Sequence, residues 1–259
     1  HLPQQLLPVE ERMKYRSAFL HLLIRNASSG LVQDPQNDKG YHRLGFAYAL
    51  LGQQEVQMLK QSGQIPAWKA LAIQKSIGML QSRRHSQAIC AYRQSLVLEP
   101  DNFEVLRELA ALYERQGMYE LSKIYREKCI EYAEQHPIPE NADVKSRDAL
   151  NDIRKFNINE FAKLNKALQQ PIKIIQDNLP KMTETKEGHS IRMGVVQFAL
   201  QNRCTQQAIE LLEGAPDLIA ADPQAGSIYV NLLYRSGQIY KATSKYEEYN
   251  SKFEQLQGN

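Results

Sequence analysis

Glycine and proline are scarce in this chain. Only 13 glycines and 11 prolines occur among 259 residues. An all-β fold depends on many tight turns that these two residues favour, so their scarcity argues against it. Glutamine, leucine, alanine, lysine and glutamate recur instead, and most of these are good helix formers. The composition therefore predicts an all-α fold with short connections.

The patterns that signal catalysis or metal binding are also missing. The sequence contains no glycine-rich phosphate loop, no GxSxG elbow and no HExxH pair of histidines. Cys90, Cys129 and Cys204 are too far apart for a zinc motif, and three cysteines do not form a disulfide framework. We therefore expect no enzyme activity, no metal and no cofactor.

An excess of one charge is absent as well. Lys and Arg together number 32 and Asp and Glu 29, and the basic residues are scattered among the acidic ones. This balance argues against nucleic-acid binding. No apolar run reaches the roughly 20 residues of a membrane span. We expect a cytoplasmic protein, but because the sequence begins at His1, a periplasmic or envelope location applies if a targeting segment was removed.

Three similar turn sequences divide the chain. They are 34–37 (DPQN), 99–102 (EPDN) and 222–224 (DPQ). In each, proline stops one helix, and the acidic or amide side chains are suited to cap the next. Pro35 and Pro100 lie about two 34-residue periods apart. The spacing predicts a repeated helical unit.

The segments between these turns share a pattern of small, aromatic and glycine residues. A small residue such as Gly45, Ala110 or Ala242 lets two antiparallel helices approach closely. A glycine is expected to end each first helix, because it adopts a left-handed conformation at little cost. The three expected helix ends are Gly52, Gly117 and Gly237. Weaker matches to a second helix are Ala88, Tyr92, Ser95 and Pro100, and Ala208 with Leu212.

This pattern resembles the tetratricopeptide repeat family, most clearly over residues 38–52 and 101–119. The resemblance implies antiparallel helix pairs stacked as an α-solenoid, a superhelix. Between Pro137 and Gly188 the repeat pattern is missing although apolar residues keep helical spacing, so a non-repeat helical insert is expected there. We expect an N-terminal capping helix and repeats over 1–137, the insert over 138–187, and C-terminal repeats over 188–259.

The resemblance also implies a function. In tetratricopeptide arrays the first helices line a concave groove that receives a peptide or helix of a partner protein. Phe46 and Tyr234 would be apolar anchors, and Arg107 or Arg115 would pair with carboxylates. The family's clamp for acidic chaperone tails is not expected, because His42 and Phe46 replace its lysine and asparagine. The expected groove residues are Lys39, His42, Phe46, Arg107, Ala111, Glu114, Arg115, Asn231, Tyr234 and Arg235.

Two further interpretations remain beside the adaptor or scaffold. The repeats of a self-assembling homo-oligomer would stack end to end, using an apolar stripe on the last helix. Alternatively, the chain is the non-catalytic repeat portion of a larger enzyme or envelope protein. The stripe consists of Tyr240, Tyr246, Tyr249 and Phe253.

Overall fold

The computed structural model describes residues 9–61, 67–138 and 143–257. Within these ranges every regular element is a helix and no strand occurs. This confirms the all-α expectation. The chain divides into two compact units, His1–Pro100 and Asp101–Asn259.

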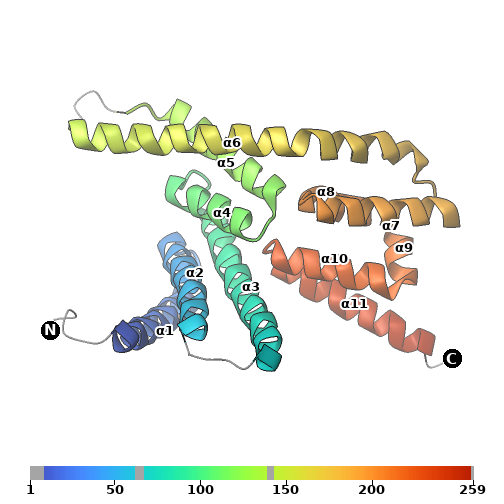
Figure 1. Cartoon of the computed structure of the whole chain (residues 1–259), viewed down its shortest axis with the longest axis horizontal. Helices are drawn as coiled ribbons and strands as arrows, with labels where there is room; N and C mark the ends of the chain where they lie inside the picture. The colour runs from blue at the N-terminus through green and yellow to red at the C-terminus, as the bar shows by residue number, and fades with distance from the viewer. Residues whose placement is uncertain (1–8, 62–66, 139–142, 258–259) are drawn as a thin grey trace. The chain divides into compact units, whose positions relative to one another are not determined.

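The first unit contains α1 (Val9–Gln33), α2 (Asp38–Gln61) and α3 (Ala67–Leu98). Helix α2 packs against both α1 and α3 (Figure 1). The expected turn at 34–37 separates α1 from α2, and Asn37 Oδ1 accepts a hydrogen bond from Gly40 N at 2.8 Å. The side chain of Asn37 thus satisfies a free N–H at the start of α2.

Gly45 lies at a close approach of α2 and α3, as its sequence context predicts. A Cβ atom at this position would lie 2.6 Å from Cδ1 of Tyr92, whose side chain is fully buried. Nearby, Ser95 Oγ donates to the Asp38 carbonyl at 3.1 Å. The tyrosine therefore fills the space that the missing side chain leaves.

The prediction that Gly52 ends a helix is wrong. Helix α2 continues through this buried glycine to Gln61. A Cβ atom on Gly52 would lie 2.9 Å from Cβ of Arg84, so the glycine serves a second close contact with α3. Arg84 also donates two hydrogen bonds to the carboxylate of Glu55, at 2.9 and 3.0 Å. These contacts hold the two helices together beyond Gly52.

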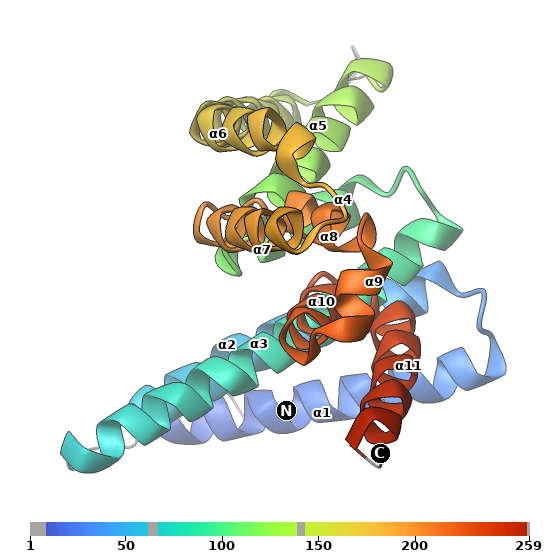
Figure 2. The same ribbon diagram turned by 90° about the vertical axis from the view of Figure 1, so that its right-hand side faces the viewer.

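The second unit is built from three helix hairpins, a long helix and a short one within its described residues. Figure 2 shows α5 and α6 side by side, α7 and α8 in the next layer, and α10 and α11 beyond them. The hairpins are α4 (Phe103–Arg115) with α5 (Tyr119–Gln135), α7 (Lys186–Gln201) with α8 (Thr205–Glu213), and α10 (Pro223–Arg235) with α11 (Ile239–Gln257). The remaining elements are α6 (Val144–Asn178), the 3-10 turn η2 (Leu179–Lys181) and α9 (Pro216–Ala221).

The three hairpins turn in the same way. Gly117, Arg203 and Gly237 have φ angles of 72°, 64° and 82°. The next residue of each turn donates its N–H, at 2.8 Å in all three cases, to a carbonyl one turn back in the first helix. This is the hydrogen bond of a Schellman cap. The predicted helix ends at Gly117 and Gly237 are confirmed, whereas the turn at Arg203 was not predicted.

Helix α6 accounts for most of the predicted insert at 138–187. It packs along α5 and also contacts α7. The buried side chain of Arg126 in α5 donates to Asn157 of α6 at 2.7 Å and to Glu114 of α4 at 3.1 Å. Its guanidinium also lies 4.9 Å from the ring centre of Phe156. The boundary between the two compact units lies at Pro100, and α6 belongs with α4 and α5 to the second unit.

Candidate functional site

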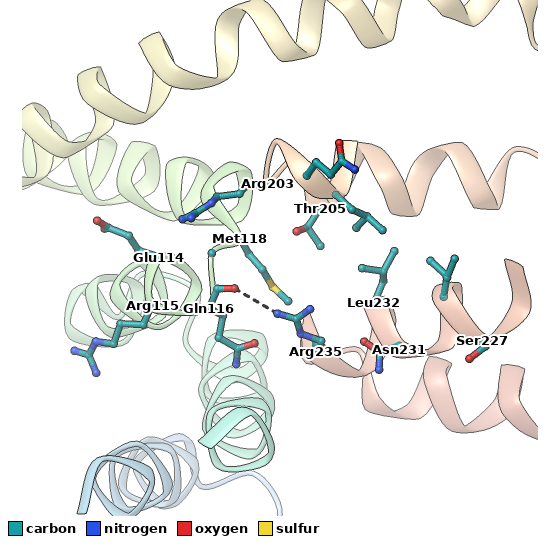
Figure 3. A pocket seen from close by; sticks show the side chains of 14 residues that line it. Glu114, Arg115, Gln116, Met118, Arg203, Thr205, Ser227, Asn231, Leu232 and Arg235 are labelled. Atoms are coloured by element: carbon teal, nitrogen blue, oxygen red, sulfur yellow. Dashed lines mark hydrogen bonds between the residues drawn. The ribbon is translucent and has the colours of Figure 1, made fainter. Parts of the chain in front are cut away.

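A pocket of about 640 Å³ lies in the second unit, where the α4–α5 turn meets α7, α8 and α10. Figure 3 shows Met118 and Leu232 at its centre, with Asn231 and Ser227 toward one side. Met118 and Leu232 are buried, whereas Asn231 and Ser227 are exposed. The pocket thus combines an apolar floor with a polar rim.

Contacts between the three hairpins hold the pocket walls in place. Tyr113 in α4 donates its hydroxyl proton to the Ser236 carbonyl at 2.9 Å. The guanidinium of Arg203 lies 4.3 Å from the ring centre of Tyr119, a cation–π contact. Together these contacts connect the first turn to the other two.

Glu120 provides a further connection between hairpins. Its carboxylate accepts a hydrogen bond from Gln207 N at 3.0 Å and so caps the N-terminus of α8. Burial raises the pKa of Glu120 above its ordinary value, although the hydrogen bonds from Gln207 oppose this. Glu120 is therefore an internal cap rather than a surface charge.

Arg235 and Gln116 form the polar part of the inner wall. Arg235 Nη2 donates to the Gln116 carbonyl at 3.3 Å, as the dashed line in Figure 3 marks. Burial lowers the pKa of Arg235, which nevertheless stays charged at neutral pH. Arg235 Nε and both amide atoms of the Gln116 side chain have no hydrogen-bond partner among the described residues. These groups are suited to bind a polar ligand.

The lining has an excess of positive charge. Arg115, Arg203 and Arg235 contribute to it, and its one carboxylate, Glu114, already pairs with Arg126 at 3.1 Å. In Figure 3 the side chains of Glu114 and Arg115 extend away from Leu232, so their charges lie at the edge of the pocket. The arrangement can hold a peptide with an apolar side chain on the floor and an acidic group at the edge.

The expected groove residues are distributed over several places. Four of them, Glu114, Arg115, Asn231 and Arg235, line the pocket. Tyr234 lines a second pocket of about 570 Å³ between α10 and α11, to which Asn231 also contributes. Arg107 and Ala111 lie on α4, are half-buried and line neither pocket, and Arg107 faces Glu108 at 3.8 Å.

The other three expected residues belong to the first unit, on α2. Lys39 is exposed, and Phe46 is 46% exposed. His42 is half-buried, with its ring centre 5.9 Å from that of Tyr92. None of the three lines either pocket.

Sequence reasoning missed the contribution of α7 to the pocket. Leu200, Gln201 and Arg203 line it, yet the sequence analysis recognised only the second helix of this hairpin. A signal for this hairpin was present in the sequence, because Arg203 and Gly237 are separated by one 34-residue period. An arginine at the left-handed position hid it, because this conformation usually requires glycine or asparagine.

Over 9–61, 67–138 and 143–257, no cluster of His, Cys, Asp and Glu side chains is arranged to hold a metal ion. Helices long and apolar enough to cross a bilayer are likewise absent from the described part of the chain. Burial raises the pKa of Cys129 to about 11 and that of Cys204 to about 12, so both thiols are protonated at neutral pH.

Comparison with known proteins provides no family for the chain. No family model matches it, and no curated protein matches it. Its function must therefore be inferred from the fold and the pocket.

Proposed function

We propose that the chain is a tetratricopeptide-type adaptor or scaffold that binds a peptide or helix of a partner protein. One observation carries the proposal. Arg115, Gln201 and Arg235 each precede the left-handed residue of their turn by two positions, and all three line the same pocket. Equivalent positions of three hairpins therefore form one surface, as expected for a repeat protein whose first helices line a groove.

The spacing of the last two hairpins supports the same class. Their left-handed residues, Arg203 and Gly237, lie one 34-residue period apart. The backbone hydrogen bonds in the two turns also follow the same pattern. In this proposal the hairpins form a solenoid, and α6 is a helical insert between the first and second of them.

Binding would depend on shape and a few polar contacts. An apolar side chain of the peptide would rest on Met118 and Leu232. The amide of Gln116 would bond to the peptide backbone, and Arg115 at the edge would pair with a carboxylate. This recognition requires no cofactor and no chemical step.

A pull-down from the source lysate tests the proposal. The bait is the full chain, compared with an Arg115→Glu/Gln201→Glu variant and with a Lys166→Glu control. All three changed side chains are exposed, and Lys166 lies on α6 outside the pocket, so each variant should fold. Circular dichroism verifies the fold first.

The proposal predicts a discrete protein that wild type and control capture and the double variant loses by at least about tenfold. Equal capture by all three baits would place binding elsewhere on the chain. If none of them captures any protein, the adaptor proposal is wrong.

A further inference from the structure

The second pocket is an apolar groove between the last two helices. Its lining includes Val230, Tyr234, Ala242, Tyr246 and Tyr249. Tyr249 is buried, but Tyr246 is 60% exposed although it belongs to this apolar surface. The exposed Tyr246 ring therefore extends the apolar surface of the groove toward solvent.

The preceding hairpin shows what covers the equivalent groove. One 34-residue period before Val230, Ala242 and Tyr246 stand Val196, Ala208 and Leu212. These three residues have no exposed surface at all. Helices α9 and α10 pack against α8, and the three residues belong to one core cluster with Tyr229 and Leu232 of α10. In this hairpin a following amphipathic helix fills the groove.

The face that α10 buries defines the chemistry of such a helix. It presents small residues at Ala225 and Gly226, an aromatic residue at Tyr229, and leucines at 232 and 233. This is the i, i+4, i+7 pattern of an amphipathic helix that docks into a groove. A second copy of this chain does not offer α10, because each copy buries that face in its own core.

The charges around the groove also favour an apolar partner. Lys241 is paired with Glu213 at 2.5 Å, and Lys245 with Glu248 at 2.7 Å. The polar residues of the lining, Ser227, Asn231, Thr243 and Asn250, are neutral. Unlike the first pocket, this groove has no excess of arginine to select an acidic peptide.

We propose that the α10–α11 groove is a second docking site, which binds an amphipathic α-helix of a partner protein. The partner helix carries small, aromatic and leucine residues at the spacing that α10 shows. When it is bound, the partner helix packs against α10 and α11 in the way that α10 packs against the preceding hairpin. This site does not depend on the function proposed for the first pocket.

A direct binding measurement tests this inference. The probe is a fluorescent peptide with the sequence of residues 222–236, held helical by a hydrocarbon cross-link between positions 227 and 231, which α10 exposes. The cross-link avoids the cost of forming a short helix, which is marginal in water. Fluorescence anisotropy follows its titration with the full chain, beside a cross-linked peptide of scrambled sequence.

Two exposed tyrosines of α11 provide a matched pair of variants. Tyr246 lines the groove, whereas Tyr240, which is 85% exposed, does not. The probe should bind saturably, Tyr246→Asp should weaken binding at least about tenfold, and Tyr240→Asp should leave it unchanged. Thr243→Lys, at a second exposed lining position, should weaken binding as well.

Three results would overturn the inference. The first is no saturable binding up to roughly 1 mM peptide, and the second is equal binding of the scrambled peptide. The third is self-association of the wild-type chain, seen by light scattering and lost in Tyr246→Asp, which would show that a second copy occupies the groove. The Arg115→Glu/Gln201→Glu variant should bind the probe normally, so failure of one site is distinguishable from failure of the other.

Discussion

Hairpin α2–α3 in the first unit and hairpin α4–α5 in the second pack their two helices in a similar way, but their first helices end differently relative to a glycine. In both, a small residue of the first helix lies against the second helix. Gly45 contacts the ring of Tyr92, and the Ala110 carbonyl accepts a hydrogen bond from Ser122 Oγ at 2.9 Å. Helix α4 then ends before Gly117, whereas α2 continues past Gly52.

Gly117 and Gly52 were both predicted to end a first helix, but glycine is required at the two positions for different physical reasons. Gly117 has a φ of 72°, and a Cβ atom there would meet no atom closer than 3.7 Å. Gly52 lies within a helix, and the contact with Arg84 leaves no room for a Cβ atom. The first glycine is required by backbone conformation and the second by close packing. A sequence pattern that fixes only the residue type does not separate the two.

The largest predicted effect is at the close approach itself. Gly45→Ala places a methyl group 2.6 Å from the buried ring of Tyr92, so we expect a loss of about 3 kcal/mol in the free energy of unfolding. Urea denaturation followed by circular dichroism measures it. Tyr92→Leu should recover part of the loss in the double variant.

Gly30→Ala is the control for this prediction. A Cβ atom at Gly30 in α1 would meet nothing within 4 Å, and alanine is the better helix former. This change should leave stability equal or slightly higher. If Gly45→Ala lowers the free energy of unfolding no more than Gly30→Ala does, α2 and α3 do not approach each other closely at Gly45.

The second prediction concerns what holds α2 and α3 together beyond Gly52. Arg84→Gln removes a half-buried guanidinium that donates two hydrogen bonds to Glu55. We expect a loss of about 1.5 kcal/mol, since hydrogen bonds to charged groups contribute about this much. Amide hydrogen exchange should also become faster in the part of α2 that follows Gly52.

The neighbouring Arg83 provides the matched control, because it is exposed. Arg83→Gln should change stability by less than about 0.5 kcal/mol. Equal effects of the two changes would mean that net charge, rather than the Arg84–Glu55 pair, stabilises this part of the hairpin.

The third prediction separates the two kinds of glycine. At Gly117, alanine should cost about 1 kcal/mol because of the left-handed backbone. Asparagine should cost less than alanine there, since it tolerates this conformation. At Gly52 the order should reverse, because the larger side chain meets Arg84. Thermal denaturation of the four variants measures the order, and the same order at both sites would contradict the distinction.

The elements and caps that depend on local chemistry could be predicted from the sequence. Asn102 caps α4 by accepting a hydrogen bond from Val105 N at 3.2 Å, and Asp222 caps α10 by accepting one from Gln224 N at 2.8 Å. Each lies in an expected acidic–proline turn. These caps involve residues two or three positions apart, so the sequence pattern contains the whole interaction.

The features that depend on distant residues could not be predicted. Gly52 is explained by Arg84, and Arg203 has the support of a stacking contact with Tyr119. The pocket was predicted only in part for the same reason. Its walls include α7, which is followed by Arg203 rather than glycine at the left-handed position, and a turn residue, Gln116, whose role depends on Arg235.

The smallest predicted effect is on the pH dependence of stability and concerns Glu120, which connects hairpin α4–α5 to hairpin α7–α8. Its pKa is raised by burial, so the folded protein binds this proton more tightly than the unfolded chain does. The contribution of Glu120 to stability is therefore greatest below its ordinary pKa of 4.5 and falls as pH rises through the raised value. Glu120→Gln keeps an acceptor for Gln207 N and has no charge, so it should remove this decline.

Urea denaturation at several pH values above 4.5 measures the difference between wild type and Glu120→Gln. The control is Glu127→Gln, on an exposed position of the same helix. It should follow the wild-type profile. If Glu120→Gln also follows that profile, the carboxylate is not held in a buried site, and the contact between α5 and α8 is looser than the capping hydrogen bond implies. A stability profile that Glu120→Gln makes less dependent on pH would instead support a buried Glu120 carboxylate at the N-terminus of α8. Since α5 and α8 belong to different hairpins, this contact would then join hairpin α4–α5 to hairpin α7–α8.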